Sequence, residues 1–298
     1  MKVLIAGARS ALGSRVSLLL RADGHDVVGL SRTPAQGFVT ADVLDSDAVR
    51  RAVAEAVPDA LVQTLNALPK SGPRRLADLA ATGRLRTDGT RNLLTAARAA
   101  GVTKYVAENF FFGYGTTGNG SLPLTEDSPF EAAGNPAVAQ DEQVRDFGGV
   151  SLRCGLFYGP GVGSTESLAD AVRRRRMPVV RGAQNVVSHL HIDDAAAAVV
   201  AALHEGKPGA AYNIADDEPA GMHDFVRELA RQLGASQPYA VPLWVVRAAA
   251  GAYAAGFLTS NLAIDNGKAK RDLGWSPAYP SIRDGLKTVA AGRLSSAV

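Results

Sequence analysis

The stretch Val3-Leu4-Ile5-Ala6-Gly7-Ala8-Arg9-Ser10-Ala11-Leu12-Gly13 decides the fold of this chain. Its first four residues are typical of a buried β-strand, and the residues from Ala11 onward have the apolar spacing of an amphipathic helix. Backbone N–H groups at such a turn, together with the helix dipole, bind a pyrophosphate. Gly7 allows the tight turn and Gly13 lets the helix pack closely, while Ser10 stands where a further glycine is usual. The stretch therefore predicts a dinucleotide-binding turn.

Short apolar runs alternate with amphipathic stretches through the first half of the chain, as in βαβ units that build a parallel sheet. The pattern predicts helices over Ala11–Ala22, from Asp45 or Ser46 to Ala56, up to Ala100 before Gly101, and over Ala137–Phe147. It predicts strands over Val3–Ala6, His25–Leu30, Phe38–Ala41, Ala60–Leu65, Lys104–Ala107 and Val150–Arg153. We therefore expect an α/β fold with a Rossmann-type doubly wound parallel sheet.

The composition changes beyond Tyr158-Gly159-Pro160-Gly161 to helices alternating with short strands, without a second glycine turn. We expect residues 1–160 to form an NADP-binding Rossmann core, to which strands and helices from 183–215 are added. Residues 161–298 are expected to form mainly a smaller C-terminal α/β substrate-binding lobe that is interwoven with the core. The segment Gly113–Pro136 is dense in Gly, Thr, Ser, Asn and Pro, which is typical of a functional loop.

Length and composition exclude several classes of protein. The chain has 298 residues, of which 46% are hydrophobic and 20% charged, so that it can bury about 75% of its unfolded surface. This excludes a disordered or collagen-like chain. Lys and Arg exceed Asp and Glu by 32 − 29 = 3. Although the calculated pI is near 9.1, this small excess gives little support to a nucleic-acid or membrane partner.

Two local features have ordinary structural explanations. The basic run Arg173–Arg176 closes an expected helix over Ser167–Arg176, where cations complement the helix dipole. The apolar stretch Val241–Thr259 is interrupted by Arg247 and contains two glycines, so a buried or half-buried helix explains it better than a membrane span.

The cellular setting is predicted from the cysteine content and the N-terminus. A single cysteine, Cys154, cannot form an internal disulfide and fits a reducing cytoplasm. The first apolar run is too short for a signal peptide. We expect a cytoplasmic protein with a small-molecule substrate, and exposed helices would support a homodimer.

The residues after the second predicted strand bear on the choice of cofactor. They read Leu30-Ser31-Arg32, whereas an NAD-preferring site places Asp or Glu there for the ribose 2′-hydroxyl. The guanidinium of Arg32 and the hydroxyl of Ser31 suit a 2′-phosphate, which Arg9 can also approach, so NADP(H) is expected. Asp42 is placed either to accept from the adenine amino group or to cap a helix. The predicted nucleotide contacts are Gly7, Arg9, Ser10, Ala11, Leu12, Gly13, Ser31, Arg32, Asp42, Val43, Leu65, Asn66 and Ala67.

Further motifs extend over nearly the whole chain. They are Thr87–Leu94, Leu156–Gly161, His191–Asp194, Tyr212–Pro219 and Lys268–Trp275. With the N-terminal turn, they resemble the extended short-chain dehydrogenase/reductase superfamily, of the NAD-dependent epimerase/dehydratase kind. Tyr105–Phe110 is most similar to an atypical branch of that superfamily. The resemblance implies a Rossmann fold and a nicotinamide cofactor.

The chemistry that this resemblance implies depends on a Tyr followed four residues later by Lys, because the ammonium lowers the pKa of the phenol. None of the seven tyrosines has Lys at that spacing. An alignment on Glu142 puts Gly134 and Val138 at the two positions, and neither can carry a proton. Phe110 stands where the family has a helper Ser or Thr, which leaves Asn109 as the nearest polar side chain.

Other residues near the expected nicotinamide site offer substitutes. Tyr114 and Tyr158 follow predicted strands and are candidates to polarise a carbonyl group, with Asn109 as a neutral hydrogen-bond donor and Glu108 as an acid. Packing of either tyrosine, with its hydroxyl on backbone, is an equal alternative. The run Phe110-Phe111-Phe112 is expected to wall an apolar substrate pocket, with core packing explaining part of it.

Metal binding and the common hydrolase mechanisms have little support. His189 and His191 share one face of a predicted strand, but no Cys or third His accompanies them, so we expect no metal. Asp193 and Asp194 are expected to cap the helix that follows. Neither a Gly-x-Ser-x-Gly nor a His-Glu-x-x-His motif occurs.

Three functions remain open at this point. The preferred one is an NADPH-dependent oxidoreductase that reduces a small, fairly apolar carbonyl or enone, with a proton from Tyr114, Tyr158 or water. The second is a lyase, cyclase or isomerase without net redox chemistry on the same fold. The third is an NADP(H) sensor or binding protein that has lost catalysis.

Overall fold

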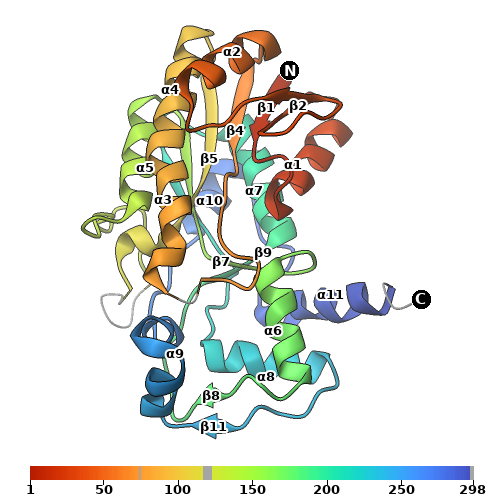
Figure 1. Ribbon diagram of the computed structural model, residues 1–298, viewed down its shortest axis with the longest axis vertical. Helices are drawn as coiled ribbons and strands as arrows, with labels where there is room; N and C mark the ends of the chain where they lie inside the picture. The colour runs from red at the N-terminus through yellow and green to blue at the C-terminus, as the bar shows by residue number, and fades with distance from the viewer. Residues whose placement is uncertain (74, 117–122, 296–298) are drawn as a thin grey trace.

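The computed structural model describes residues 1–73, 75–116 and 123–295. Within these residues one sheet has seven parallel strands in the order β10-β6-β5-β4-β1-β2-β3 (Figure 1). They are β1 (Lys2–Ala6), β2 (Asp26–Ser31), β3 (Phe38–Thr40), β4 (Ala60–Gln63), β5 (Lys104–Phe110), β6 (Val150–Cys154) and β10 (Ala211–Ile214). Since consecutive strands run outward from β1 in both directions, the sheet is doubly wound, as predicted.

Helices cover both faces of this sheet (Figure 1). One apolar cluster joins the sheet to α1 (Ala11–Ala22), α7 (Ile192–Glu205) and α10 (Gly267–Leu273). The cluster on the other face includes α2 (Ser46–Ala56), α4 (Thr90–Ala99) and α5 (Pro136–Asp146). Burial on both faces explains why Val3, Leu4, Ile5 and Ala6 form an unbroken apolar run instead of alternating with polar residues.

The rest of the chain packs below the sheet in the view of Figure 1. A third apolar cluster joins α6 (Gly163–Arg173), α8 (Met222–Gln232) and α11 (Ile282–Ser295). Two further pairs of short strands lie outside the main sheet. They are β7 (Leu156–Tyr158) with β9 (His189–His191), and β8 (Val179–Val180) with β11 (Ala240–Val241).

The helical region that was predicted before Gly101 is present, but it is divided into several segments. The chain forms a 3-10 turn, η1 (Leu76–Leu79), then α3 (Ala80–Arg84), and then a π-helical turn, η2 (Leu85–Gly89), before α4 begins. A π-helical turn accommodates an extra residue within a helix. Arg86 and Gly89 of that turn are both buried. The Arg86 side chain extends to the end of β5, where it forms a hydrogen bond with Asn109.

The two predicted helix ends with charged residues were partly wrong. Helix α6 ends at Arg173, because Arg175 takes a left-handed backbone conformation with φ of +55°. Helix α7 is capped by His191, whose ring accepts a hydrogen bond from the N–H of Asp193. The carboxylate of Asp194 instead accepts hydrogen bonds from the backbone of Ala278 and Tyr279, so a tertiary partner replaces the expected cap.

The apolar C-terminal stretch forms α9 (Leu243–Leu258), which is interrupted at Gly251 with φ of +86°. It is less buried than predicted, since the Trp244 side chain is 71% exposed. In the part of the chain that is described, no helix combines the length and apolar character that crossing a bilayer requires.

Candidate nucleotide and acceptor site

The predicted nucleotide contacts come together at one edge of the main sheet. Ala6, the last residue of β1, lies beside Leu30 of β2 and Gln63 of β4, and Ser31 lies beside Thr40 of β3. The turns that leave these four strands therefore start side by side. In open parallel sheets, ligands bind outside this carboxyl edge. The residues placed along it are Gly7–Gly13, Ser31–Arg32, Asp42–Val43 and Leu65–Ala67.

The turn after β1 fits a pyrophosphate. A Cβ at Gly7 would lie 2.6 Å from the carbonyl oxygen of Thr64, and a Cβ at Gly13 would lie 2.1 Å from that of Gly7. Ser10 caps α1, and its Oγ accepts a hydrogen bond from the N–H of Gly13 at 2.9 Å. The first N–H groups of a helix have no intrahelical acceptor, and the first turn of α1 holds no acidic residue. Backbone donors and a positive helix end therefore face the space where a phosphate would bind.

Two arginines and two hydroxyl groups surround the end of β2. Arg9 Nη1 donates a hydrogen bond to Thr33 Oγ1 at 3.0 Å, and its guanidinium lies over the Phe38 ring at 5.1 Å. The N–H of Thr33 donates to Ser31 Oγ, while the Arg32 side chain is exposed. Thr33 was not predicted from the sequence, although a second hydroxyl two residues after Ser31 was a usable signal. This set of donors suits a phosphate on the ribose.

The turns after β3 and β4 are held by local hydrogen bonds. The Asp42 carboxylate accepts from the N–H of Leu44, and the Val43 side chain is buried in the core, so that only its backbone faces the edge. Asn66 Oδ1 accepts from the N–H of Leu68, whereas the N–H of Ala67 donates to Thr82 on α3. These bonds leave Asp42 in a turn-forming role, and any contact of its carboxylate with adenine remains a prediction.

A buried polar network lies at the carboxyl end of β5. Arg86 Nη1 donates to Asn109 Oδ1 at 2.9 Å and to Gln140 Oε1 at 2.7 Å. Arg86 Nη2 lies 3.2 Å from Glu108 Oε1. Each of these four residues is at most 9% exposed. Neither Arg86 nor Gln140 was singled out from the sequence, although Arg86 directly precedes the motif Thr87–Leu94.

Asn109 lies at the end of β5, where it was predicted, but its amide group is engaged within the protein. Its side chain is fully buried, and Oδ1 also accepts from the N–H of Phe110 at 2.7 Å. Its Nδ2 donates to the carbonyl oxygen of Ala137 at 2.9 Å. Because these bonds engage both ends of the amide, Asn109 holds the end of β5 and does not present a free donor to an acceptor.

Tyr158 is misplaced for catalysis. It is 1% exposed, and its hydroxyl donates to Asp216 Oδ2 at 2.8 Å. Its side chain packs against Gly285 of α11, in the space that a Cβ at that position would occupy. Burial raises the pKa of this phenol. The physical reason is topological: β7 pairs with β9 and not with the main sheet, which carries Tyr158 into the C-terminal apolar cluster.

Tyr114 is half-buried beside a cation. Its hydroxyl accepts from Arg153 Nη1 at 2.8 Å and donates to Asn213 Oδ1 at 2.9 Å. Burial raises the pKa of the phenol, and the Arg153 guanidinium opposes that effect. Arg153 in turn forms two hydrogen bonds with Asp141, at 2.7 and 3.0 Å. This ion pair was not predicted from the sequence, although an arginine within the predicted strand Val150–Arg153 indicated a buried partner.

The three phenylalanines after Asn109 divide between core and surface. Phe111 is fully buried, whereas Phe110 and Phe112 are half-buried, with ring centroids 4.9 Å apart. Leu156 and Phe257 belong to the same apolar cluster and are also half-buried. Phe111 is therefore a core residue, whereas Phe110 and Phe112 keep partly exposed rings, and an apolar wall around a substrate stays a prediction.

His189 and His191 point toward apolar and hydroxyl neighbours. The His189 ring stacks on Phe225 with centroids 4.9 Å apart, and burial lowers its pKa to about 4. His191 Nε2 is hydrogen-bonded to Thr288 Oγ1 at 2.9 Å. Their surroundings are those of packed residues in the C-terminal cluster.

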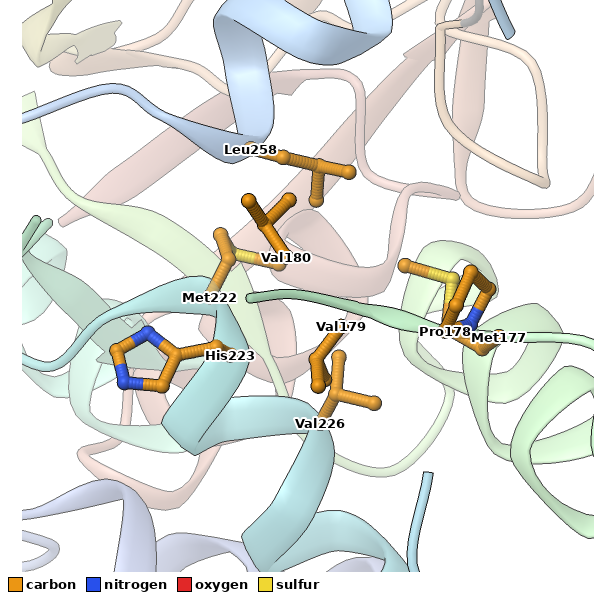
Figure 2. A pocket seen from close by; sticks show the side chains of 8 residues that line it. All are labelled: Met177, Pro178, Val179, Val180, Met222, His223, Val226 and Leu258. Carbon is orange, nitrogen blue, oxygen red and sulfur yellow. The ribbon is translucent and has the colours of Figure 1, made fainter. Parts of the chain in front are cut away.

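Two hollows in the described residues lie in the C-terminal part of the chain. The small one in Figure 2 has a volume of about 10 Å³, which is room for about one water molecule. Its lining is Met177, Pro178, Val179, Val180, Met222, His223, Val226 and Leu258. The other, of about 390 Å³, is lined mainly by charged residues of α8 and by Ser281–Arg283. Neither contains a residue of the glycine turn.

Curated relatives match this chain over most of its length. It is 38% identical to a 3-diazoavenalumate denitrifying reductase from a Streptomyces species, over 96% of this chain and 99% of that protein. It is 28% identical to the 2-alkyl-3-oxoalkanoate reductase of Stenotrophomonas maltophilia, over 79% of this chain and 76% of that protein.

Solved structures show the same fold. UDP-glucose 4-epimerase from Thermotoga maritima, with UDP-glucose, has a TM-score of 0.82 at 18% identity and full coverage of both chains. A human epimerase family protein with NADPH has a TM-score of 0.80 at 21% identity, covering 98% of this chain and 99% of that one. The family model described as the NAD dependent epimerase/dehydratase family matches residues 3–215. The chain therefore belongs to the NAD dependent epimerase/dehydratase family.

Proposed function

We propose that this chain is an NADPH-dependent reductase that acts on a small acceptor at the carboxyl end of β5. The reductase names of the two relatives support an NAD(P)-dependent oxidoreductase. The choice of NADPH rests on one observation, the Arg9 guanidinium held against Thr33 and Phe38 beside Ser31. We further propose that residues 1–160, with parts of 183–215, form the cofactor core and that 161–298 mainly bind the substrate.

Each part of the edge has a separate task in this proposal. The N–H groups of Ala11 and Leu12 would bind the pyrophosphate, and Arg9 would bind the 2′-phosphate. Leu65–Ala67, at the end of the central strand β4, would lie along the nicotinamide ribose. The space beside β5 would then receive the nicotinamide ring and, against Phe110 and Phe112, the acceptor.

The acceptor must be reduced without the usual acid of the family. Helix α5 begins at Pro136, two residues after Gly134, and Val138 lies in its first turn. Near these positions Arg86 keeps its proton at all ordinary pH values, and Glu108 is paired with it. Because Arg86 and Glu108 are hydrogen-bonded to each other, we assign neither as the proton donor to an alkoxide formed by carbonyl reduction.

An aryl diazonium compound meets this requirement, and we propose it as the first acceptor class. When bound, NADPH would supply a hydride to the carbon that bears the diazonium group, while the carbon–nitrogen bond would break and dinitrogen would leave with the bonding electrons. The balance is one hydride taken up, one dinitrogen lost, and no proton consumed. The diazo and denitrifying terms in the name of the 38% identical relative support this choice.

The test follows the origin of the new hydrogen atom. The protein is incubated with 4-carboxybenzenediazonium and either (4-²H)NADPH, in both stereoisomeric forms, or NADPH in D₂O, and the benzoate formed is analysed by mass spectrometry. We expect deuterium at the former diazonium carbon from one stereoisomer only, and none from D₂O. A protein-free reaction and an NADH reaction are the controls. Label that comes from D₂O, or equal label from both stereoisomers, would contradict enzymatic hydride transfer.

A carbonyl or enone acceptor is the second candidate, because one relative is named as a 2-alkyl-3-oxoalkanoate reductase and because Tyr114 lies 2.8 Å from a guanidinium. Tyr114→Phe separates the two candidates, with Tyr158→Phe as the matched control. Carbonyl reduction should lose at least about tenfold in kcat/KM with Tyr114→Phe, whereas diazonium reduction should be unchanged.

Product formation without net NADPH oxidation would favour a lyase, cyclase or isomerase. Tight NADPH binding without turnover of either class would favour a sensor.

A further inference from the structure

A buried arginine in the π-helical turn η2 has no role in the nucleotide contacts described above. Arg86 is 9% exposed, and its guanidinium reaches the carboxyl end of β5. A guanidinium cannot lose its proton in a protein, so its burial requires a nearby negative charge. Glu108 supplies that charge at 3.2 Å.

The contacts of Arg86 join three separate elements. Nη1 donates to Asn109 on β5 and to Gln140 on α5, while the arginine itself lies on η2. Gln140 Nε2 also donates to the backbone carbonyl oxygen of Glu108 at 3.0 Å. The Arg86 guanidinium therefore links β5 to α5 through Asn109 and Gln140, and Gln140 also bonds directly to β5. These hydrogen bonds set the distance between the two elements.

Asn109 transmits this constraint to the half-buried Phe110. Its Oδ1 accepts hydrogen bonds from both Arg86 and the N–H of Phe110, at 2.9 and 2.7 Å. Because a guanidinium only donates, it fixes which end of the amide faces η2. It thereby fixes the backbone at Phe110, whose ring contacts that of Phe112.

We infer that Arg86 is a positioning residue that holds the Asn109–Phe110 end of β5 where the acceptor must meet the cofactor. The inference rests on the proposed function for its effect on catalysis, but the positioning itself can be measured without substrate. A misplacement of about 1 Å can cost about 100-fold in rate, so loss of this contact is expected to affect turnover more than NADPH binding.

The experiment uses four variants of the full chain. Arg86→Met removes the charge, Arg86→Lys keeps it, and Arg86→Met with Glu108→Gln removes both charges of the pair. Arg91→Met is the matched control, since Arg91 is an exposed arginine on α4 whose side chain is 63% accessible and paired with Asp88. The measurements are amide hydrogen exchange over residues 105–112, NADPH affinity, kcat and KM for the acceptor, and thermal unfolding.

Arg86→Met should exchange faster at the end of β5 and lose roughly 10- to 100-fold in kcat/KM, mainly through kcat, with NADPH affinity nearly unchanged. The double variant should regain thermal stability, because the uncompensated carboxylate is gone, but it should regain neither the protection from exchange nor kcat/KM. Arg86→Lys should recover part of both, and Arg91→Met should resemble the wild type.

Two other results of this experiment would lead to different conclusions. If the double variant recovers wild-type exchange and kcat/KM, Arg86 only compensates the charge of Glu108, and the inference is overturned. If the wild-type protein turns over no acceptor, the proposed function fails, while faster exchange in Arg86→Met and in the double variant still supports the positioning role. Should Arg86→Met fail to fold, the double variant and Arg86→Lys carry the same comparison.

Discussion

Replacing Arg9 by Ala should change the preference between NADPH and NADH more than it changes the affinity for the dinucleotide itself. The Arg9 guanidinium is held over Phe38 and hydrogen-bonded to Thr33, so it is oriented before any phosphate binds. A hydrogen bond between charged partners contributes about 1.5–3 kcal/mol. At about 1.4 kcal/mol for each factor of ten, its loss raises the Kd of NADPH roughly 10- to 150-fold. NADH lacks the 2′-phosphate, so its Kd should stay within about threefold.

Calorimetric titration of both cofactors at one fixed ionic strength measures this ratio, since salt screens exposed charges. Arg51→Ala is the matched control, because Arg51 is an exposed arginine on α2 and its removal changes the net charge equally. Arg9→Lys keeps the charge but loses the planar fork, and should lie between Arg9→Ala and the wild type. An equal loss of affinity for NADPH and NADH in Arg9→Ala, or no loss for either, would refute the placement of the 2′-phosphate beside Arg9.

Three other predictions test separate parts of the molecule. Gly13→Ala would place a Cβ 2.1 Å from the Gly7 carbonyl oxygen and should abolish NADPH binding in calorimetry. The control Gly256→Ala, whose Cβ would meet open space, should bind NADPH normally. Normal binding by Gly13→Ala would contradict a pyrophosphate site at the turn after β1. Tyr158→Phe loses the hydrogen bond to Asp216 and should lower the free energy of unfolding, measured with a chemical denaturant, by about 1 kcal/mol, while kcat/KM stays unchanged. A large fall in kcat/KM would show that this tyrosine takes part in catalysis. Burial lowers the pKa of His189 to about 4, so between pH 6.5 and 4 the unfolded chain binds a proton that the folded chain does not, and stability falls as the pH falls. His189→Leu should therefore reduce the acid-induced loss of unfolding free energy by up to about 3 kcal/mol. If the unfolding curves of this variant show the same pH dependence as those of the wild type, His189 does not titrate in this way.

The first βαβ unit could be predicted almost to the residue. Helix α1 has the predicted limits, Ala11 and Ala22, and β1 differs by one residue. These elements are specified by neighbours in the chain: Ser10 caps the helix by accepting from Gly13 three residues later, and the apolar spacing is read within one or two turns. The seventh strand, β10, lies within the range 183–215 that was expected to join the core, but its four residues lack a distinctive local pattern.

The sequence by itself determined the glycine turn, the parallel sheet with helices on both faces, and the absence of a Tyr–Lys pair, because each depends on residue types at short and regular spacings. Only the tertiary structure decided which polar residues lie at the end of β5. Arg86 meets Asn109 and Gln140 from 23 and 54 residues away, and Tyr158 leaves the main sheet because β7 pairs with β9. The burial that gives a charge its partner, or removes a tyrosine from solvent, arises only when distant segments pack together, so no local pattern specifies it.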